Sequence, residues 1–175
     1  FLNTSDSKGG AAIAAKRLMD TLRKEGIDVS MIVRDKATDD PAVIKIRSSK
    51  WMNKIRFMYE RLGIFIHNGF NRENLFAVSQ ANTGVDISRY NEVKRADIIH
   101  IHWINQGFLS LKDVQRLVAI GKPIVWTMHD MWPCTGICHH ARDCVSFMSQ
   151  CGGCFFLQSK KKRDLSTAVF LKKQE

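Results

Sequence analysis

The segment IVWTMHDMWPCTGICHHARDC, residues 124–144, holds three histidines, three cysteines and two aspartates. An imidazole titrates near neutral pH, so His129 could donate to a sugar hydroxyl or move a proton, with Asp130 beside it in the same catalytic site. Thiolates are ligands for zinc. These residue types allow a catalytic site or a metal site, and the choice depends on the scaffold that carries them.

Four cysteines form a candidate metal site. Cys151 and Cys154 in CGGC could be half of a zinc site, because the glycines allow a tight turn that aims two thiolates at one metal. Cys138 and Cys144 would be the other half, although the five residues between them exceed the usual two to four. Reduced thiols and a disulfide are the alternatives. Because four thiolates leave no open coordination position, we expect any zinc here to be structural.

Gly9 and Gly10 are candidates for binding a phosphate. At a turn from a strand to a helix, glycines let backbone N–H groups approach an anion, and the helix dipole adds about half a positive charge. The glycine pattern of dinucleotide-binding folds and the lysine of a P-loop are both missing. The alternative is a tight turn whose small residues serve packing of the helix on the sheet.

Alternating strands and helices would position these residues. Apolar runs predict strands within residues 1–5, 27–35, 95–103 and 122–128, and helical spacing predicts helices at 11–25 and 110–120. Strands and helices that alternate at these lengths predict an α/β fold, with a Rossmann-like, mostly parallel sheet and helices on both faces. Ligands of such sheets bind at the carboxyl ends of the strands, where all of the candidate residues except the four cysteines fall.

Two aromatic residues and a histidine are candidates for binding a sugar. Trp103 and Trp132 could stack on a sugar ring, although packing explains large aromatic residues equally well. His102 ends a predicted strand and shares a face with His100. The alternative for these two histidines is a hydrogen-bonded place in the core.

The net charge of +10 comes from two segments, residues 45–72 with +6 and residues 160–175 with +4. The first segment mixes its cations with aromatic and aliphatic residues, which suits contact with an anionic membrane surface. The alternatives are an ordinary helix that packs its apolar stripe on the sheet and a groove for nucleic acid. The 175 residues fit one domain, and we expect no membrane span and no secretory leader.

Three stretches together resemble one known family: GGAAIAAKRLMDTLRKEGIDVSMIVRDK, ADIIHIHWINQGFLSL and KPIVWTMHDMWPCTGICHHARDC with CGGC. They are similar to the N-terminal half of bacterial GT-B glycosyltransferases of family four, in particular enzymes of capsular and surface polysaccharide synthesis. The resemblance implies that residues 1–175 form a single acceptor-side domain, a fragment that lacks the C-terminal donor-binding domain with its paired glutamates. Alone, such a fragment would be inactive.

The resemblance also implies a function and roles for residues. A retaining hexosyltransferase would move a sugar from a nucleotide sugar to a lipid-linked or growing glycan, in the cytoplasm or at the inner face of the cell membrane, with no metal needed for transfer. Gly9 and Gly10 would lie against the donor diphosphate. His129 would reach the donor sugar or the reaction centre from the acceptor side. The acceptor site would include His102, Trp103 and Trp132. The chain departs from the family pattern at Cys134, Ile137, His140 and Phe155.

A different class of function remains as the alternative. The thiols and the positive charge would also fit a basic nucleic-acid-binding module stabilised by zinc. Against it, the sequence has no aromatic and glycine motif for RNA and no recognition-helix pattern. We therefore expect a nucleotide sugar and a glycan as partners, and not a nucleic acid.

Overall fold

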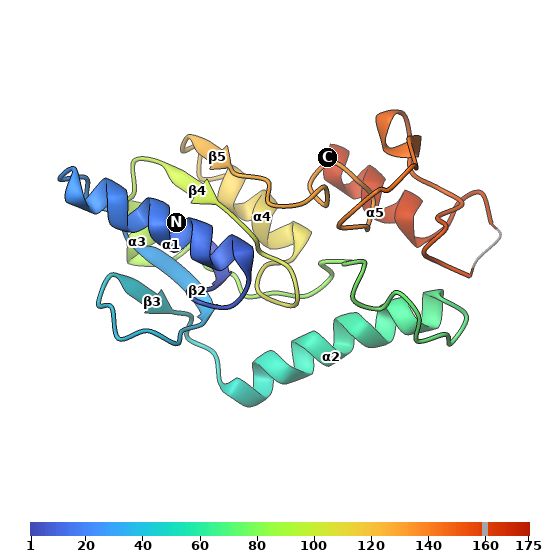
Figure 1. The fold of residues 1–175 in the computed structure, drawn as a ribbon, viewed down its shortest axis with the longest axis horizontal. Coiled ribbons are helices and arrows are strands. Elements are labelled where there is room, and N and C mark those ends of the chain that lie inside the picture. The colour runs from blue at the N-terminus through green and yellow to red at the C-terminus, as the bar shows by residue number, and fades with distance from the viewer. Residues whose placement is uncertain (159–160) are drawn as a thin grey trace.

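The computed structural model describes residues 1–158 and 161–175, so Lys160 of the second basic segment lies outside the described residues (Figure 1). The helices and strands follow in the order β1 (Leu2–Ser5), α1 (Gly10–Lys24), β2 (Met31–Asp35), β3 (Val43–Lys45), α2 (Lys50–His67), α3 (Asn91–Arg95), β4 (Ile99–Ile101), α4 (Leu111–Val118), β5 (Ile124–Trp126), the 3₁₀ helix η1 (Ser146–Met148) and α5 (Leu165–Gln174).

The five strands form one sheet in the order β3-β2-β1-β4-β5. Every pair of neighbours is parallel. The predicted parallel α/β fold is thus confirmed, and its strands are shorter than the apolar runs suggested. The short edge strand β3 was missed, because three residues after a turn give no periodic signal.

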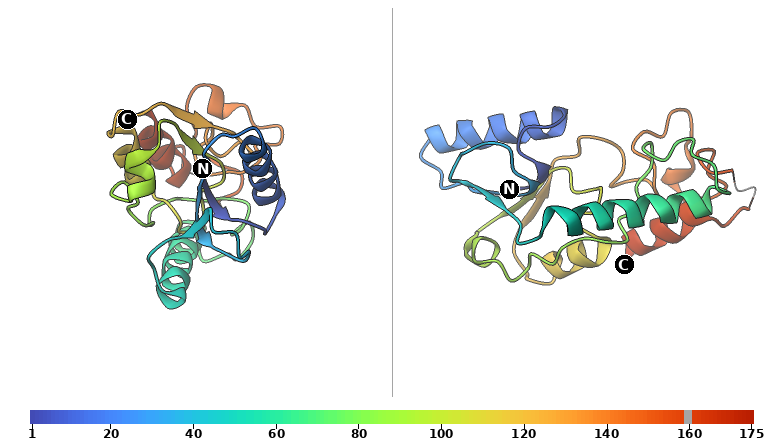
Figure 2. Two further views of the ribbon diagram at one scale, coloured as in Figure 1. Left: turned by 90° about the vertical axis from the view of Figure 1, so that its left-hand side faces the viewer. Right: turned by 90° about the horizontal axis from the view of Figure 1, so that it is seen from below.

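Helices cover both faces of the sheet, with α1 on one side and α3 and α4 on the other (Figure 2). The alternation of side chains along β2 explains this arrangement. Met31 and Val33 pack with Ala15 and Met19 of α1. Ile32 points to the opposite face and joins the core that includes Leu117 of α4.

Local signals set the ends of two helices. Ser110 caps α4: its hydroxyl accepts a hydrogen bond from the Asp113 backbone N–H, and the Asp113 carboxylate accepts from the Ser110 N–H. After α1, Gly26 adopts a φ of 81°, a left-handed conformation that favours glycine. These ends agree with the predicted boundaries of both helices.

A second core lies beside the sheet, where α2, α5 and the long loop between β5 and α5 meet (Figures 1 and 2). Ile64 of α2, Ile137 of the loop and Val169 of α5 are all buried there. An antiparallel bridge between Val78 and Cys138 joins the chain after α2 to the loop. In the part of the chain that the structure describes, no helix is long and apolar enough to cross a membrane.

Candidate active site

Hydrogen bonds tie strand β1 to the loops after β4 and β5 at the carboxyl edge of the sheet. The Asn3 side chain accepts from the Trp103 backbone N–H at 2.9 Å, and the Thr4 hydroxyl donates to the Trp103 carbonyl at 2.9 Å. The Trp103 indole N–H donates to the Asp130 carboxylate at 2.8 Å. The structure therefore brings the ends of these three strands together in one rigid network.

His102 and His129 form a pair at the ends of β4 and β5. Nδ1 of His102 and Nε2 of His129 are 2.9 Å apart, and the tautomers decide which nitrogen donates. Burial, together with the neighbouring histidines, lowers the pKa of His102 to about 3. Burial also lowers the pKa of His129, against the attraction of Asp130. Both imidazoles are therefore neutral at pH 7.

The two members of this pair have different access to the outside. His102 is only 3% exposed and stacks on His100 with ring centroids 4.3 Å apart, so it occupies the place of a hydrogen-bonded core histidine. His129 is partly exposed. Within the described part of the chain, no hydrogen bond reaches its Nδ1. His129 is thus the member of the pair that can meet a ligand, and His102 holds it in place.

Asp130 extends the network around Trp103 to His139 and Trp132. Its carboxylate accepts hydrogen bonds from the Trp103 indole, from Nδ1 of His139 at 2.7 Å and from the Trp132 backbone N–H at 2.9 Å. Burial alone would raise the pKa of Asp130, but these hydrogen bonds outweigh it and keep the pKa below its ordinary value. Both carboxylate oxygens of Asp130 already accept hydrogen bonds from the protein. Asp130 therefore holds the side chains of Trp103 and His139 in position.

His139 is a site residue that the sequence did not single out. Besides its contact with Asp130, its Nε2 lies 2.9 Å from the Ser79 hydroxyl. The pairing of residues 77–79 with 137–139 creates this contact, as in the hydrogen bond from the His139 N–H to the Ala77 carbonyl. Because residues sixty positions apart meet here, spacing along the chain carried no signal of it.

Trp132 is part of the core. It is 1% exposed, its indole N–H donates to the Ser79 carbonyl at 2.9 Å, and the Lys173 ammonium lies 3.5 Å from its ring centroid. No face of this ring is open to a sugar, so the structure does not support the expected role of Trp132 in the acceptor site. Trp103 remains half-buried at the edge of the sheet.

The turn at Gly9 and Gly10 is open to solvent. Gly9 needs to be glycine because its φ is 88°. Gly10 has no such reason, since a Cβ added there would have no atom within 4 Å. The packing explanation therefore fails for Gly10. Gly9, the N-cap residue of α1, has no side chain to cap the helix, and among the described residues no side chain accepts a hydrogen bond from the first-turn N–H groups. These N–H groups are therefore available to a ligand.

Residues 8–148 match the family model of Glycosyltransferase Family 4. The chain belongs to this family. The resemblance in its motifs is thereby confirmed, and the sheet edge described above is the edge of a glycosyltransferase domain.

A curated relative is similar to a shorter part of this family-four domain. WcaC of Escherichia coli (strain K12), assigned as a colanic acid biosynthesis glycosyl transferase, is 35% identical over 63 residues. The match covers 33% of this chain and spans only 16% of the length of WcaC. Among solved structures, none matches the chain significantly.

The first basic segment of the family-four domain includes α2, which exposes apolar side chains and buries charged ones. Its exposed face carries an apolar stripe that includes Trp51, 70% exposed, and Met58, 54% exposed. Its inner face buries Glu60 and Arg61, whose charged groups lie 3.2 Å apart. The alternative in which this helix packs its apolar stripe on the sheet is therefore wrong.

Proposed function

We propose that the chain is the acceptor-side half of a retaining glycosyltransferase that moves a sugar from a nucleotide sugar to a lipid-linked or growing polysaccharide. Membership of the family and the description of WcaC support this reaction and this class of product. The observation that carries the proposal is the edge of the sheet, where the open turn at Gly10 and the neutral His129 follow strands of one hydrogen-bonded network.

The donor diphosphate would rest at the start of α1. Negative charge builds on the leaving diphosphate in the transition state, and uncapped N–H groups of a helix stabilise such charge. The Ser5 hydroxyl already accepts from the N–H groups of Ser7 and Lys8, so the turn is held in shape before any ligand binds. We expect these dipoles, with cations of a second domain, to serve in place of a metal ion.

His129 would face the donor sugar from the acceptor side. A neutral imidazole can donate a hydrogen bond from one nitrogen and accept with the other. His102 engages Nε2, which leaves Nδ1 for the substrate. Asp130 would act as a positioning residue that orients Trp103, and the half-buried Trp103 would border the acceptor site.

The variant Gly10→Ala tests the diphosphate site. The fold should be unchanged or more stable by up to about 1 kcal/mol, because alanine favours a helix and its Cβ meets nothing. The methyl group would obstruct the approach of a phosphate, so affinity for the nucleotide sugar should fall by about tenfold or more. Calorimetric titration of full-length protein with the donor measures this. Gln115→Ala, a neutral change at an exposed position of α4 away from this turn, is the control and should leave donor affinity unchanged.

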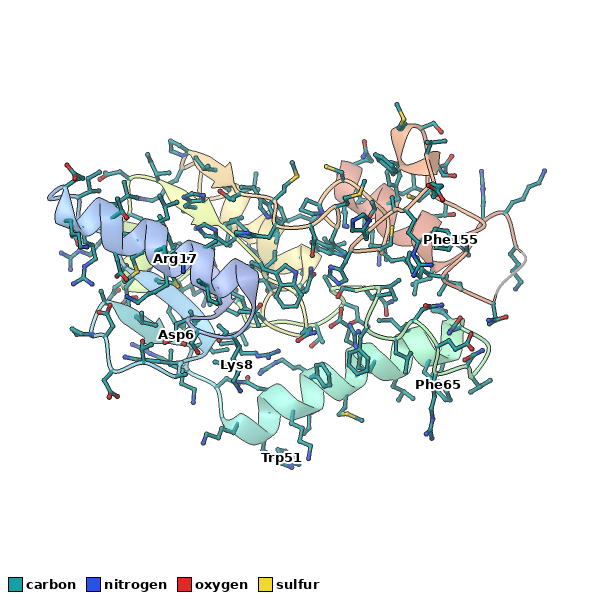
Figure 3. The ribbon with its side chains drawn as sticks, viewed as in Figure 1. Asp6, Lys8, Arg17, Trp51, Phe65 and Phe155 are labelled. Atoms are coloured by element: carbon teal, nitrogen blue, oxygen red, sulfur yellow. The ribbon has the colours of Figure 1, made fainter. Side chains whose placement is uncertain are left out.

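The exposed face of α2 suits a membrane that carries the acceptor. Trp51 points away from the rest of the molecule (Figure 3). The stripe repeats at helical spacing and consists of Trp51, Ile55, Met58, Leu62 and Ile66. The exposed cations Arg47, Lys50 and Lys54 lie at the first part of this helix and the turn before it. The apolar side chains would insert among lipid tails, and the cations would contact anionic headgroups. This contact would place the active site at the cytoplasmic face of the membrane.

Vesicle binding tests this orientation. Trp51→Glu combined with Met58→Glu should weaken binding to vesicles with anionic lipid at least about tenfold. Each change removes apolar area that would enter the membrane and adds a negative charge that anionic lipid repels. Co-sedimentation at two salt concentrations measures it. Val145→Glu combined with Met148→Glu is the control, because these two exposed apolar residues lie at η1 and not on α2. Salt-sensitive binding to RNA with no preference for vesicles would instead favour a nucleic-acid module.

A further inference from the structure

Four of the five cysteines surround one small cavity in the second core. Cys138, Cys144, Cys151 and Cys154 all line it, together with Gly136 and Phe147. The fifth, Cys134, is exposed and takes no part in the cavity. All five are free thiols in this structure. Four cysteines from different parts of an irregular loop are thus brought to one cavity. Packing of a small apolar core does not require that all four residues be cysteine.

Close backbone contacts hold the loop in this shape. A Cβ on Gly136 would lie 2.4 Å from the Ser166 carbonyl oxygen, and one on Gly152 would lie 2.3 Å from the Lys162 carbonyl oxygen. These distances are too short for any side chain, so both glycines are needed where the loop meets the chain at the start of α5. The cysteine pairs therefore approach each other on a fixed backbone.

Backbone N–H groups point at two of the sulfur atoms. The Gly136 N–H donates to the Cys151 sulfur at 3.1 Å. The Phe156 N–H, two residues past Cys154, does the same for the Cys154 sulfur. Hydrogen bonds from amides to sulfur are the outer contacts that orient metal-bound cysteines.

We propose that Cys138, Cys144, Cys151 and Cys154 bind one structural Zn²⁺ ion. Four sulfur ligands at tetrahedral positions suit zinc, and the site keeps no open position for catalysis. Each thiol gives its proton to water on binding, so Zn²⁺ with four thiolates makes a centre of charge −2. The Lys173 ammonium, which interacts electrostatically with Cys138 and Cys151, would balance part of this charge.

Zinc binding would change the orientation of the four cysteine side chains. Among residues 1–158 and 161–175, no group of three or more histidine, cysteine, aspartate or glutamate side chains is arranged to hold a metal ion as it stands. A cysteine has a single rotatable bond to its sulfur, so turning the four side chains into the cavity requires rotamer changes on a backbone that already surrounds it.

Metal analysis of the protein tests the site. The chain is produced untagged in medium with added zinc, purified under reducing conditions, and measured for bound zinc by atomic emission. We expect one zinc per chain, and the intense visible bands of tetrahedral thiolate coordination when Co²⁺ replaces it. Cys151→Ser with Cys154→Ser should lose the zinc and the cobalt bands, whereas Cys134→Ser should keep both.

A second measurement covers the case in which the double variant does not fold. Removing the metal from the unaltered chain with a chelator should lower its melting temperature, and added Zn²⁺ should restore it. The proposal is overturned if the unaltered chain holds no zinc and gives no thiolate bands with Co²⁺, or if mass analysis of the native protein finds these cysteines joined in disulfides. Neither outcome touches the proposed sugar transfer, which uses other residues.

Discussion

Alanine in place of His129 should lower the turnover number of the full-length enzyme by about 100-fold to 10,000-fold and change donor affinity little. The variant removes the imidazole whose Nδ1 is left open by the His102 contact, while the N–H groups of α1 that would bind the diphosphate stay in place. Steady-state kinetics with a nucleotide sugar and a glycan acceptor, together with donor titration, separate the two effects.

His140→Ala is the matched control for this prediction. His140 belongs to the same loop but is exposed and lies outside the network at the sheet edge. Its loss should leave turnover within about twofold of the unaltered enzyme, as for surface changes that disturb no contact. Equal turnover in His129→Ala and the unaltered enzyme would reject the role assigned to His129. Loss of donor binding with turnover preserved at saturation would reject it as well.

Alanine in place of Glu60 should lower the free energy of unfolding by about 3–5 kcal/mol. The Glu60 carboxylate is fully buried and accepts hydrogen bonds from the N–H groups of Gln80 and Ala81, both at 2.9 Å. It also neutralises Arg61, which is 5% exposed. The variant leaves a buried guanidinium without its counter-charge and two N–H groups without an acceptor. Urea unfolding followed by tryptophan fluorescence measures the loss.

Two further variants separate charge from packing. Glu73→Ala removes an exposed glutamate just after α2 and should cost less than about 0.5 kcal/mol. Glu60→Ala combined with Arg61→Met removes both charges, so it should be more stable than Glu60→Ala alone by at least about 1 kcal/mol. A Glu60→Ala protein as stable as the parent would show that the ion pair does not anchor α2.

The architecture of the sheet could be predicted because its signals are local. Apolar runs ended by turn residues, and helical spacing such as that of Ala15 and Met19, depend only on neighbours in the sequence. The cap at Ser110 and the glycine at 26 mark helix ends in the same way. The parallel order then follows from the alternation of strands and helices, and it places the candidate residues along one edge.

The same local signals did not determine how each side chain is used. The sequence placed His102 and His129 near the same edge, but only the packing of β4 beside β5 decided that one is buried and the other partly open. It offered Trp132 for stacking, and the pairing with residues near Ser79 enclosed it. Whether a side chain is buried depends on which other elements pack against it, and the periodicity of the sequence carries no information about those elements.

What the sequence determined by itself is therefore the parallel α/β sheet, the family and the edge that carries the candidate site. Only the tertiary structure decided that Asp130 joins Trp103 to His139, that four cysteines share a cavity, and that α2 turns its apolar stripe outward. The physical reason is common to all three. An amphipathic pattern defines two faces of an element, whereas contacts between residues far apart in the chain decide which face is covered.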